Sequence, residues 1–95
     1  MKSIIQLNKD SCYLCGRNGY SEPLDEHHVF AGGNRKLSEK YGLKVYLCHW
    51  TCHLNGVHKD GEMAEKLKAD VQKKAMEHYG WSMSDFIAIF GKNYI

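Results

Sequence analysis

Two close cysteine pairs constrain the fold of this chain more than any other feature. They are Cys12/Cys15 and Cys48/Cys52. Four thiolates at these spacings suit the closed tetrahedral shell of a structural zinc ion, and Gly16 permits the tight turn of a metal-binding knuckle. His49 or His53 could replace Cys52 in that shell. A domain of 95 residues buries a modest share of its surface, so a structural metal would add needed stability.

Composition predicts an intracellular protein with one domain, residues 1–95. No apolar run reaches the roughly 18 residues of a membrane-spanning helix, and residues 1–10 hold too few apolar side chains for a secretory signal. We therefore expect a cytoplasmic protein without a membrane segment. In a reducing compartment, close cysteine pairs are more often metal ligands than disulfides.

Positive charge is concentrated in the middle of the chain. The net charge is +2, but residues 31–60 alone hold five Lys or Arg against two Asp or Glu. Such a segment can contact the phosphates of nucleic acid, which gives affinity without sequence preference. The candidate DNA contacts are Arg35, Lys36 and Lys44. A solvated surface is the alternative interpretation of so small a patch.

Apolar and turn-forming residues predict two strands in the first half of the chain. The strands are expected over Leu24–Phe30 and Leu43–Leu47, with a turn at residues 31–34 and a helical turn at Ser38–Tyr41 between them. A helix is expected to begin near Thr51. The helix-breaking pair Asn55-Gly56 leaves the length of that helix open.

The second half of the chain is predicted to be helical. Apolar residues recur every four positions from Met63 to Tyr79, which predicts an amphipathic helix from about Gly61 to His78. Ser84 is expected to cap a final short helix that Gly91 ends. We interpret these apolar stripes mainly as core, so the helical part, about 61–95, packs against a ligand-rich part, about 10–60.

Adjacent histidines on the first predicted strand suggest two different roles. Side chains of His27 and His28 should point to opposite faces of the strand. One ring can ligate a metal ion while the other takes a proton from water. An ion held by His27, His53 and His58 would keep open positions for a phosphate oxygen. The alternative is that some of these rings are surface or core histidines, as we expect for His78.

The ordered motifs resemble a known family. They are Cys12-x-x-Cys15, Glu26-His27-His28, Gly42 to Cys48, Cys52-His53 and Gly56-Val57-His58. Together they resemble the zinc-bracketed H-N-H endonucleases (His-Me finger nucleases), especially small phage-type members. The resemblance implies an α+β fold in which two strands and a helix hold a divalent ion, a ββα-metal core, joined to a treble-clef-like zinc site and followed by C-terminal helices.

The resemblance also implies hydrolysis of DNA phosphodiester bonds by a phage- or prophage-encoded enzyme. His28 would be the general base, and the catalytic ion would be held by His27, His53 and His58. That ion could be Mg²⁺, Mn²⁺, Ni²⁺ or Zn²⁺, although imidazole ligands suit Mg²⁺ least. Arg35 would clamp DNA or stabilise charge in the transition state. A second copy of the chain or another protein could help to select the target.

The chain departs from the family pattern at two points. The position of the family asparagine falls on Leu43 or Lys44, and neither side chain has an amide to orient the base. Asn34 and Asn55 offer amides elsewhere in the sequence. His53 and His58 are five residues apart, a spacing that does not place them on one face of an unbroken α-helix.

Two other classes of function fit the same residues. The first is a zinc-stabilised module that binds nucleic acid or protein without catalysis. The second is a phage accessory protein or inhibitor that uses the nuclease scaffold to bind a host protein through its helical C-terminal third, around Phe86 and Phe90. The nuclease is expected to cleave DNA and to bind a second metal ion, whereas the zinc module should bind one zinc ion and cleave nothing. Partner binding by the accessory protein should survive His28→Ala.

Overall fold

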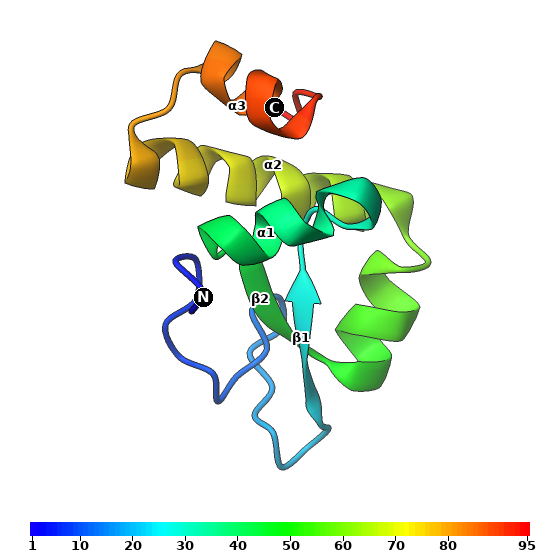
Figure 1. Ribbon diagram of the computed structural model, residues 1–95. Helices are drawn as coiled ribbons and strands as arrows, with labels where there is room; N and C mark the ends of the chain where they lie inside the picture. Colours follow the sequence, from blue (N-terminus) through cyan, green and yellow to red (C-terminus); the bar gives the residue numbers. More distant parts are fainter.

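A two-stranded antiparallel sheet and three α-helices make up the chain, whose residues 1–95 are all described by the computed structural model (Figure 1). The elements in chain order are β1 (Leu24–His28), a 3₁₀ turn (Gly32–Asn34), α1 (Arg35–Tyr41), β2 (Lys44–Cys48), a π-helix (His49–Val57), α2 (Gly61–Tyr79) and α3 (Met83–Phe90). In Figure 1, α2 runs between the sheet and α3. No helix combines the length and the apolar character needed to cross a membrane.

The register of the sheet separates two sets of side chains. His27 lies opposite Val45, and His28 lies opposite Lys44. Directly opposed residues of an antiparallel pair share a face, and neighbours along a strand alternate between faces. One face therefore carries Asp25, His27, Val45 and Leu47, and the other carries Glu26, His28, Lys44 and Tyr46. The adjacent histidines thus lie on opposite faces of β1, as predicted from their position on a strand.

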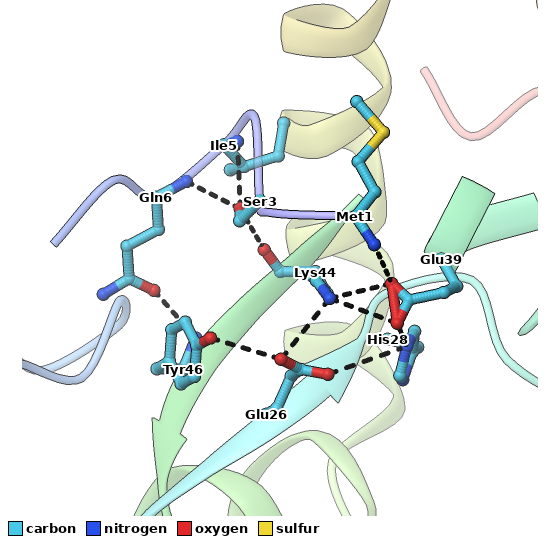
Figure 2. Close-up of polar contacts among 9 residues, drawn as sticks. All are labelled: Met1, Ser3, Ile5, Gln6, Glu26, His28, Glu39, Lys44 and Tyr46. Carbon is cyan, nitrogen blue, oxygen red and sulfur yellow. Dashed lines mark hydrogen bonds and ion pairs between the residues drawn. The ribbon is translucent and has the colours of Figure 1, made fainter. Parts of the chain in front are cut away.

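Residues 1–13 cover the outer edge of β2. Ser3 Oγ donates a hydrogen bond to the Lys44 carbonyl at 2.5 Å, and the Tyr46 amide donates to Gln6 Oε1 at 2.7 Å (Figure 2). Farther along the same edge, the Tyr13 amide donates to the Tyr46 carbonyl at 2.8 Å. These bonds satisfy backbone groups that an open edge would expose to another strand.

Aromatic rings pack the C-terminal helices onto the first half of the chain. The Phe30 ring centroid lies 5.5 Å from that of Phe86 and 4.9 Å from that of Phe90, and all three side chains are buried. Gln72, fully buried on α2, accepts a hydrogen bond from the Tyr94 amide and so holds the residues that follow α3 against α2. Because Phe86 and Phe90 are core residues, they do not form the exposed partner-binding face considered above.

The long helix predicted from about Gly61 to His78 is confirmed and ends one residue later. The predicted cap of the final helix is wrong. Ser82, and not Ser84, caps α3, because its hydroxyl accepts from the Asp85 amide while the Asp85 carboxylate accepts from the Ser82 amide. This reciprocal capping box satisfies two donors at once. β1 ends two residues earlier than predicted, β2 is shifted by one residue, and α1 begins three residues earlier, at Arg35.

The helix expected near Thr51 begins earlier, at His49, and continues through Asn55-Gly56 as a π-helix. Gly56 fits there because it is buried in close contact: a Cβ at this position would lie 3.0 Å from Met63 Sδ and 3.1 Å from the Thr51 carbonyl. A π-helix is closed by bonds between residues five apart. It therefore returns residues at this spacing to one face, which an α-helix would not do.

A glycine at the end of α1 brings residues 1–4 close to the sheet. Gly42 has φ +69°, and a Cβ there would lie 2.5 Å from the Lys2 carbonyl. We expect Gly42→Ala to destabilise the fold by more than the roughly 1–2 kcal/mol of a left-handed alanine, because the N-terminal segment must also move. Gly80→Ala is the matched control, since Gly80 has φ +70° with no atom near the added Cβ. Equal losses in urea unfolding would contradict this account.

Candidate functional site

The four cysteines come together from three segments of the chain. Cys12 and Cys15 flank the knuckle turn, Cys48 ends β2, and Cys52 lies on the π-helix. Their sulfur atoms all lie within 4.8 Å of one another. The Sγ atoms of Cys15 and Cys48 are 3.7 Å apart, close to the roughly 3.8 Å that tetrahedral bonds of about 2.3 Å to zinc require. The cluster could therefore hold a structural metal such as zinc.

The environment of these thiols favours a bound cation. Burial raises the pKa of Cys52, and neighbouring thiols raise it further. Burial acts in the same direction on Cys12, but backbone amides of Cys15 and Cys48 outweigh it and lower the pKa of Cys12 to about 7. Four charged thiolates at these distances would repel one another strongly without a cation between them. A divalent ion removes that repulsion, which agrees with the donor chemistry of a zinc site.

Three of the predicted metal-binding histidines also meet. His27 comes from β1, His53 from the π-helix and His58 from the end of that helix. Each offers one ring nitrogen within 4.8 Å of the others, and Nε2 of His53 lies 2.9 Å from Nε2 of His58. The His58 amide donates to the His53 carbonyl at 3.2 Å, a bond of the π type. The five-residue spacing that does not suit an α-helix is thereby accommodated.

The chemistry of this histidine cluster fits a metal ion. Burial lowers the pKa of His27 to about 4, and the neighbouring imidazoles lower it in the same direction. His27 is therefore neutral near pH 7, as a metal ligand must be. The Nε2 atoms of His53 and His58 are 2.9 Å apart, which is too close for both to carry a proton directed at the other. This close approach is therefore stabilised either by one proton between the two nitrogens or by a cation that both nitrogens bind.

Sequence reasoning missed one residue beside the histidine cluster, Asp25. The Asp25 carboxylate accepts a hydrogen bond from Nδ1 of His53 at 2.8 Å and another from Nδ1 of His49 at 2.6 Å. Although burial opposes it, donation by these two rings lowers the pKa of Asp25. The signal was present in the sequence, since a residue two positions before His27 shares its face of a strand. The fourth position of the cysteine cluster is therefore taken by Cys52. His49 and His53, the alternatives for that position, contact the Asp25 carboxylate instead.

On the other face of β1, His28 lies in a group of charged side chains (Figure 2). Its Nε2 atom is 3.9 Å from Glu26 Oε1 and 3.7 Å from Glu39 Oε1. The Lys44 ammonium group lies 2.7 Å from Glu39 Oε2 and 3.4 Å from Glu26 Oε2. These three ionic side chains and His28 are called the charged cluster below. In the sequence, Glu26 appeared only as part of the motif Glu26-His27-His28, without a role, and Glu39 was not singled out.

This placement argues against the DNA contact predicted for Lys44. Its side chain is only 7% exposed, and two carboxylates already pair with its charge. Lys44 lies directly opposite His28 in the sheet, so it takes one of the two positions where the family asparagine was expected. Asn34 does not substitute for that amide, because its Nδ2 donates to the Phe90 carbonyl at 3.0 Å. Asn55 is exposed on the π-helix.

One hollow joins the two faces at the end of β1. A cavity of about 190 Å³ is lined by the histidine cluster, His28 and Arg35, together with Glu26 and Ala31. A neighbouring cavity of about 370 Å³ is lined by His28, Arg35, Lys36, Gly32 and Glu39, none of them hydrophobic. Arg35 and Lys36 are exposed at the start of α1. The two hollows therefore present imidazoles and cations to the same region of solvent.

No family model, curated protein or solved structure matches the chain. Function is therefore inferred from the residues and the geometry of these clusters.

The cysteine cluster predicts a defined response to substitution. We expect one zinc ion per purified chain and its loss in Cys52→Ser, because a hydroxyl is a poor replacement for a thiolate ligand. His49→Ala should retain zinc, since that ring contacts Asp25. Elemental analysis measures the zinc content. Cobalt substitution of the unmodified chain checks the ligands independently of folding, and a spectrum without sulfur-to-cobalt charge transfer would contradict thiolate coordination.

The charged cluster predicts a pH-dependent contribution to stability. Hydrogen bonds from Lys44 lower the pKa of Glu39 to about 2, against an ordinary value of 4.5. Because the folded pKa is the lower one, the stabilisation is present above pH 4.5 and is lost as pH falls towards 2. The difference in free energy of unfolding between wild type and Lys44→Met should shrink over that range. The pairing would be contradicted if the difference in free energy of unfolding did not change with pH and if the Glu39 carboxyl carbon titrated alike in wild type and Lys44→Met.

Proposed function

We propose that the chain is a metal-dependent endonuclease that hydrolyses DNA phosphodiester bonds. In this proposal β1, β2 and the π-helix form a ββα-metal core of the H-N-H type, and the cysteine cluster holds structural zinc. One observation carries the proposal: three imidazoles converge from β1 and the π-helix on a hollow that a fourth imidazole, His28, also lines. Such a set of titratable and metal-binding groups in one concave site is typical of catalysis.

Each side chain has a distinct task in the proposed reaction. His27, His53 and His58 would hold a divalent ion, which when bound neutralises charge on the scissile phosphate and on the leaving oxygen. His28 removes a proton from the attacking water. Arg35 presents a guanidinium group that can bind two phosphate oxygens at once. Three imidazole donors favour Zn²⁺, Ni²⁺ or Mn²⁺ over Mg²⁺ as the ion.

The charged cluster gives His28 a partner in place of the missing amide. Carboxylate oxygens of Glu26 and Glu39 lie within 4 Å of its Nε2 atom. Lys44 holds both carboxylates in place and is itself directly opposite His28. In this proposal an ion-paired network performs the orienting function of an asparagine side chain.

Phosphate binding is assigned to Arg35 and Lys36. Both side chains are exposed at the start of α1, and both line the larger hollow beside His28. Contacts of this kind position the DNA backbone without reading its sequence. Lys44 is excluded from this surface because its ammonium group is paired with carboxylates.

A plasmid-nicking assay tests the proposal. With zinc at the cysteine cluster and Mn²⁺, Ni²⁺ or Zn²⁺ added, we expect the unmodified chain to cut supercoiled DNA. His28→Ala should lower the rate by about 10²–10⁴-fold, as loss of a general base does. His78→Ala is the control, since His78 lies exposed on α2 away from both hollows. No cleavage by the unmodified chain, or undiminished cleavage by His28→Ala, would contradict the mechanism.

A second candidate function is supported by Lys44. Because a paired lysine lies at a position expected for the family asparagine, the chain could be a zinc-stabilised module that binds nucleic acid without cutting it. This candidate predicts one metal ion per chain and DNA affinity that depends on Arg35 and Lys36. Metal quantitation together with the nicking assay distinguishes it from the nuclease.

A further inference from the structure

Asp25 lies between the imidazole rings of His49 and His53, which belong to the π-helix. It sits on β1, on the same face as His27, and one carboxylate oxygen, Oδ2, contacts both neighbouring rings. The distances are 2.8 Å to Nδ1 of His53 and 2.6 Å to Nδ1 of His49. Both are short enough for charge-assisted hydrogen bonds from ring N–H groups. The carboxylate is thus held from two sides and has little freedom to rotate.

The bond from His53 determines which nitrogen of that ring is available for a metal. A proton on Nδ1 donates to Asp25, so in the neutral ring the lone pair is left on Nε2. That Nε2 atom faces His58, at 2.9 Å from its Nε2. The ring of His53 therefore connects the carboxylate on one side to the histidine cluster on the other. Metal-ligating histidines commonly donate their second ring nitrogen to such a carboxylate, which fixes tautomer and orientation.

We propose that Asp25 is the positioning residue of the histidine cluster. It holds His53 with Nε2 deprotonated and directed towards His27 and His58, and His49 holds the carboxylate in turn. The inference rests on the metal site of the proposed function but does not depend on DNA cleavage. Asp25 acts through His53 and is not itself one of the three ligands.

A carboxylate outside the site gives a control for charge. Glu77 is exposed on α2 and lines neither hollow beside the histidines. Glu77→Gln removes one negative charge, as Asp25→Asn does, without changing a contact of His53. Any effect common to Asp25→Asn and Glu77→Gln reflects net charge, and an effect confined to Asp25→Asn reflects the loss of the bond to His53.

Metal binding to the full, zinc-loaded chain tests the inference by calorimetric titration with Ni²⁺. We expect one further ion per chain, lost in His53→Ala. Asp25→Asn should weaken the affinity for that ion by about 10–100-fold, whereas Glu77→Gln should leave it within about twofold. Equal affinities of Asp25→Asn and wild type would overturn the inference. Two further ions, with one lost in both Asp25→Asn and His49→Ala, would also overturn it, because Asp25 would then be a ligand.

A second measurement needs no added metal and guards against misfolded variants. In zinc-loaded protein without nickel, the ¹⁵N resonances of the His53 ring should show the proton on Nδ1, and Asp25→Asn should shift the population towards Nε2. Full zinc content of each variant verifies its fold. A proton on Nε2 in wild type, or no binding of nickel by wild type, would overturn the inference. Binding that follows the expected pattern without DNA cleavage would support the inference and overturn only the proposed nuclease.

Discussion

The cysteine cluster fixes the relative positions of the segments on which the rest of the site depends. It ties the knuckle to the end of β2 and to the first turn of the π-helix. Because that helix starts at the cluster, its rotation determines where His53 and His58 point. Tyr13 adds a second anchor, since its amide bonds to β2 and its hydroxyl donates to Asp70 of α2 at 2.6 Å. A metal at the cysteines would therefore stabilise the histidine cluster as well as the fold.

The side chains of β1 contact two different sets of residues because they point alternately to the two faces of the sheet. On β1, Asp25 and His27 face the π-helix, whereas Glu26 and His28 face the charged cluster. The two environments meet only at the hollow that His27, His28 and Arg35 share. In the proposed reaction, metal binding and proton transfer would therefore be carried out by adjacent residues, without both rings binding one ion.

Burial of Lys44 is tolerated because its charge is compensated. An unpaired ammonium group in such a place would cost several kcal/mol of desolvation, and two carboxylates offset that cost. The same contacts leave Lys44 without a free charge to offer a ligand and put negative charge beside His28. Lys44 thus contributes both to the stability of the fold and to the electrostatics around His28.

The amino-acid sequence by itself determined three features: two close pairs of cysteines suited to binding a metal, the opposite directions of the His27 and His28 side chains, and the amphipathic helix now seen as α2. Each of these depends on local spacing or periodicity. Only the tertiary structure shows that the helix carrying His53 takes the π form and continues through Asn55-Gly56, with Gly56 buried against Met63. It also decided the partners of Asp25, which lie 24 and 28 residues farther along the chain, and those of Lys44, which come from β1 and α1. Charge pairing of this kind follows from three-dimensional proximity, which no local pattern of residues encodes.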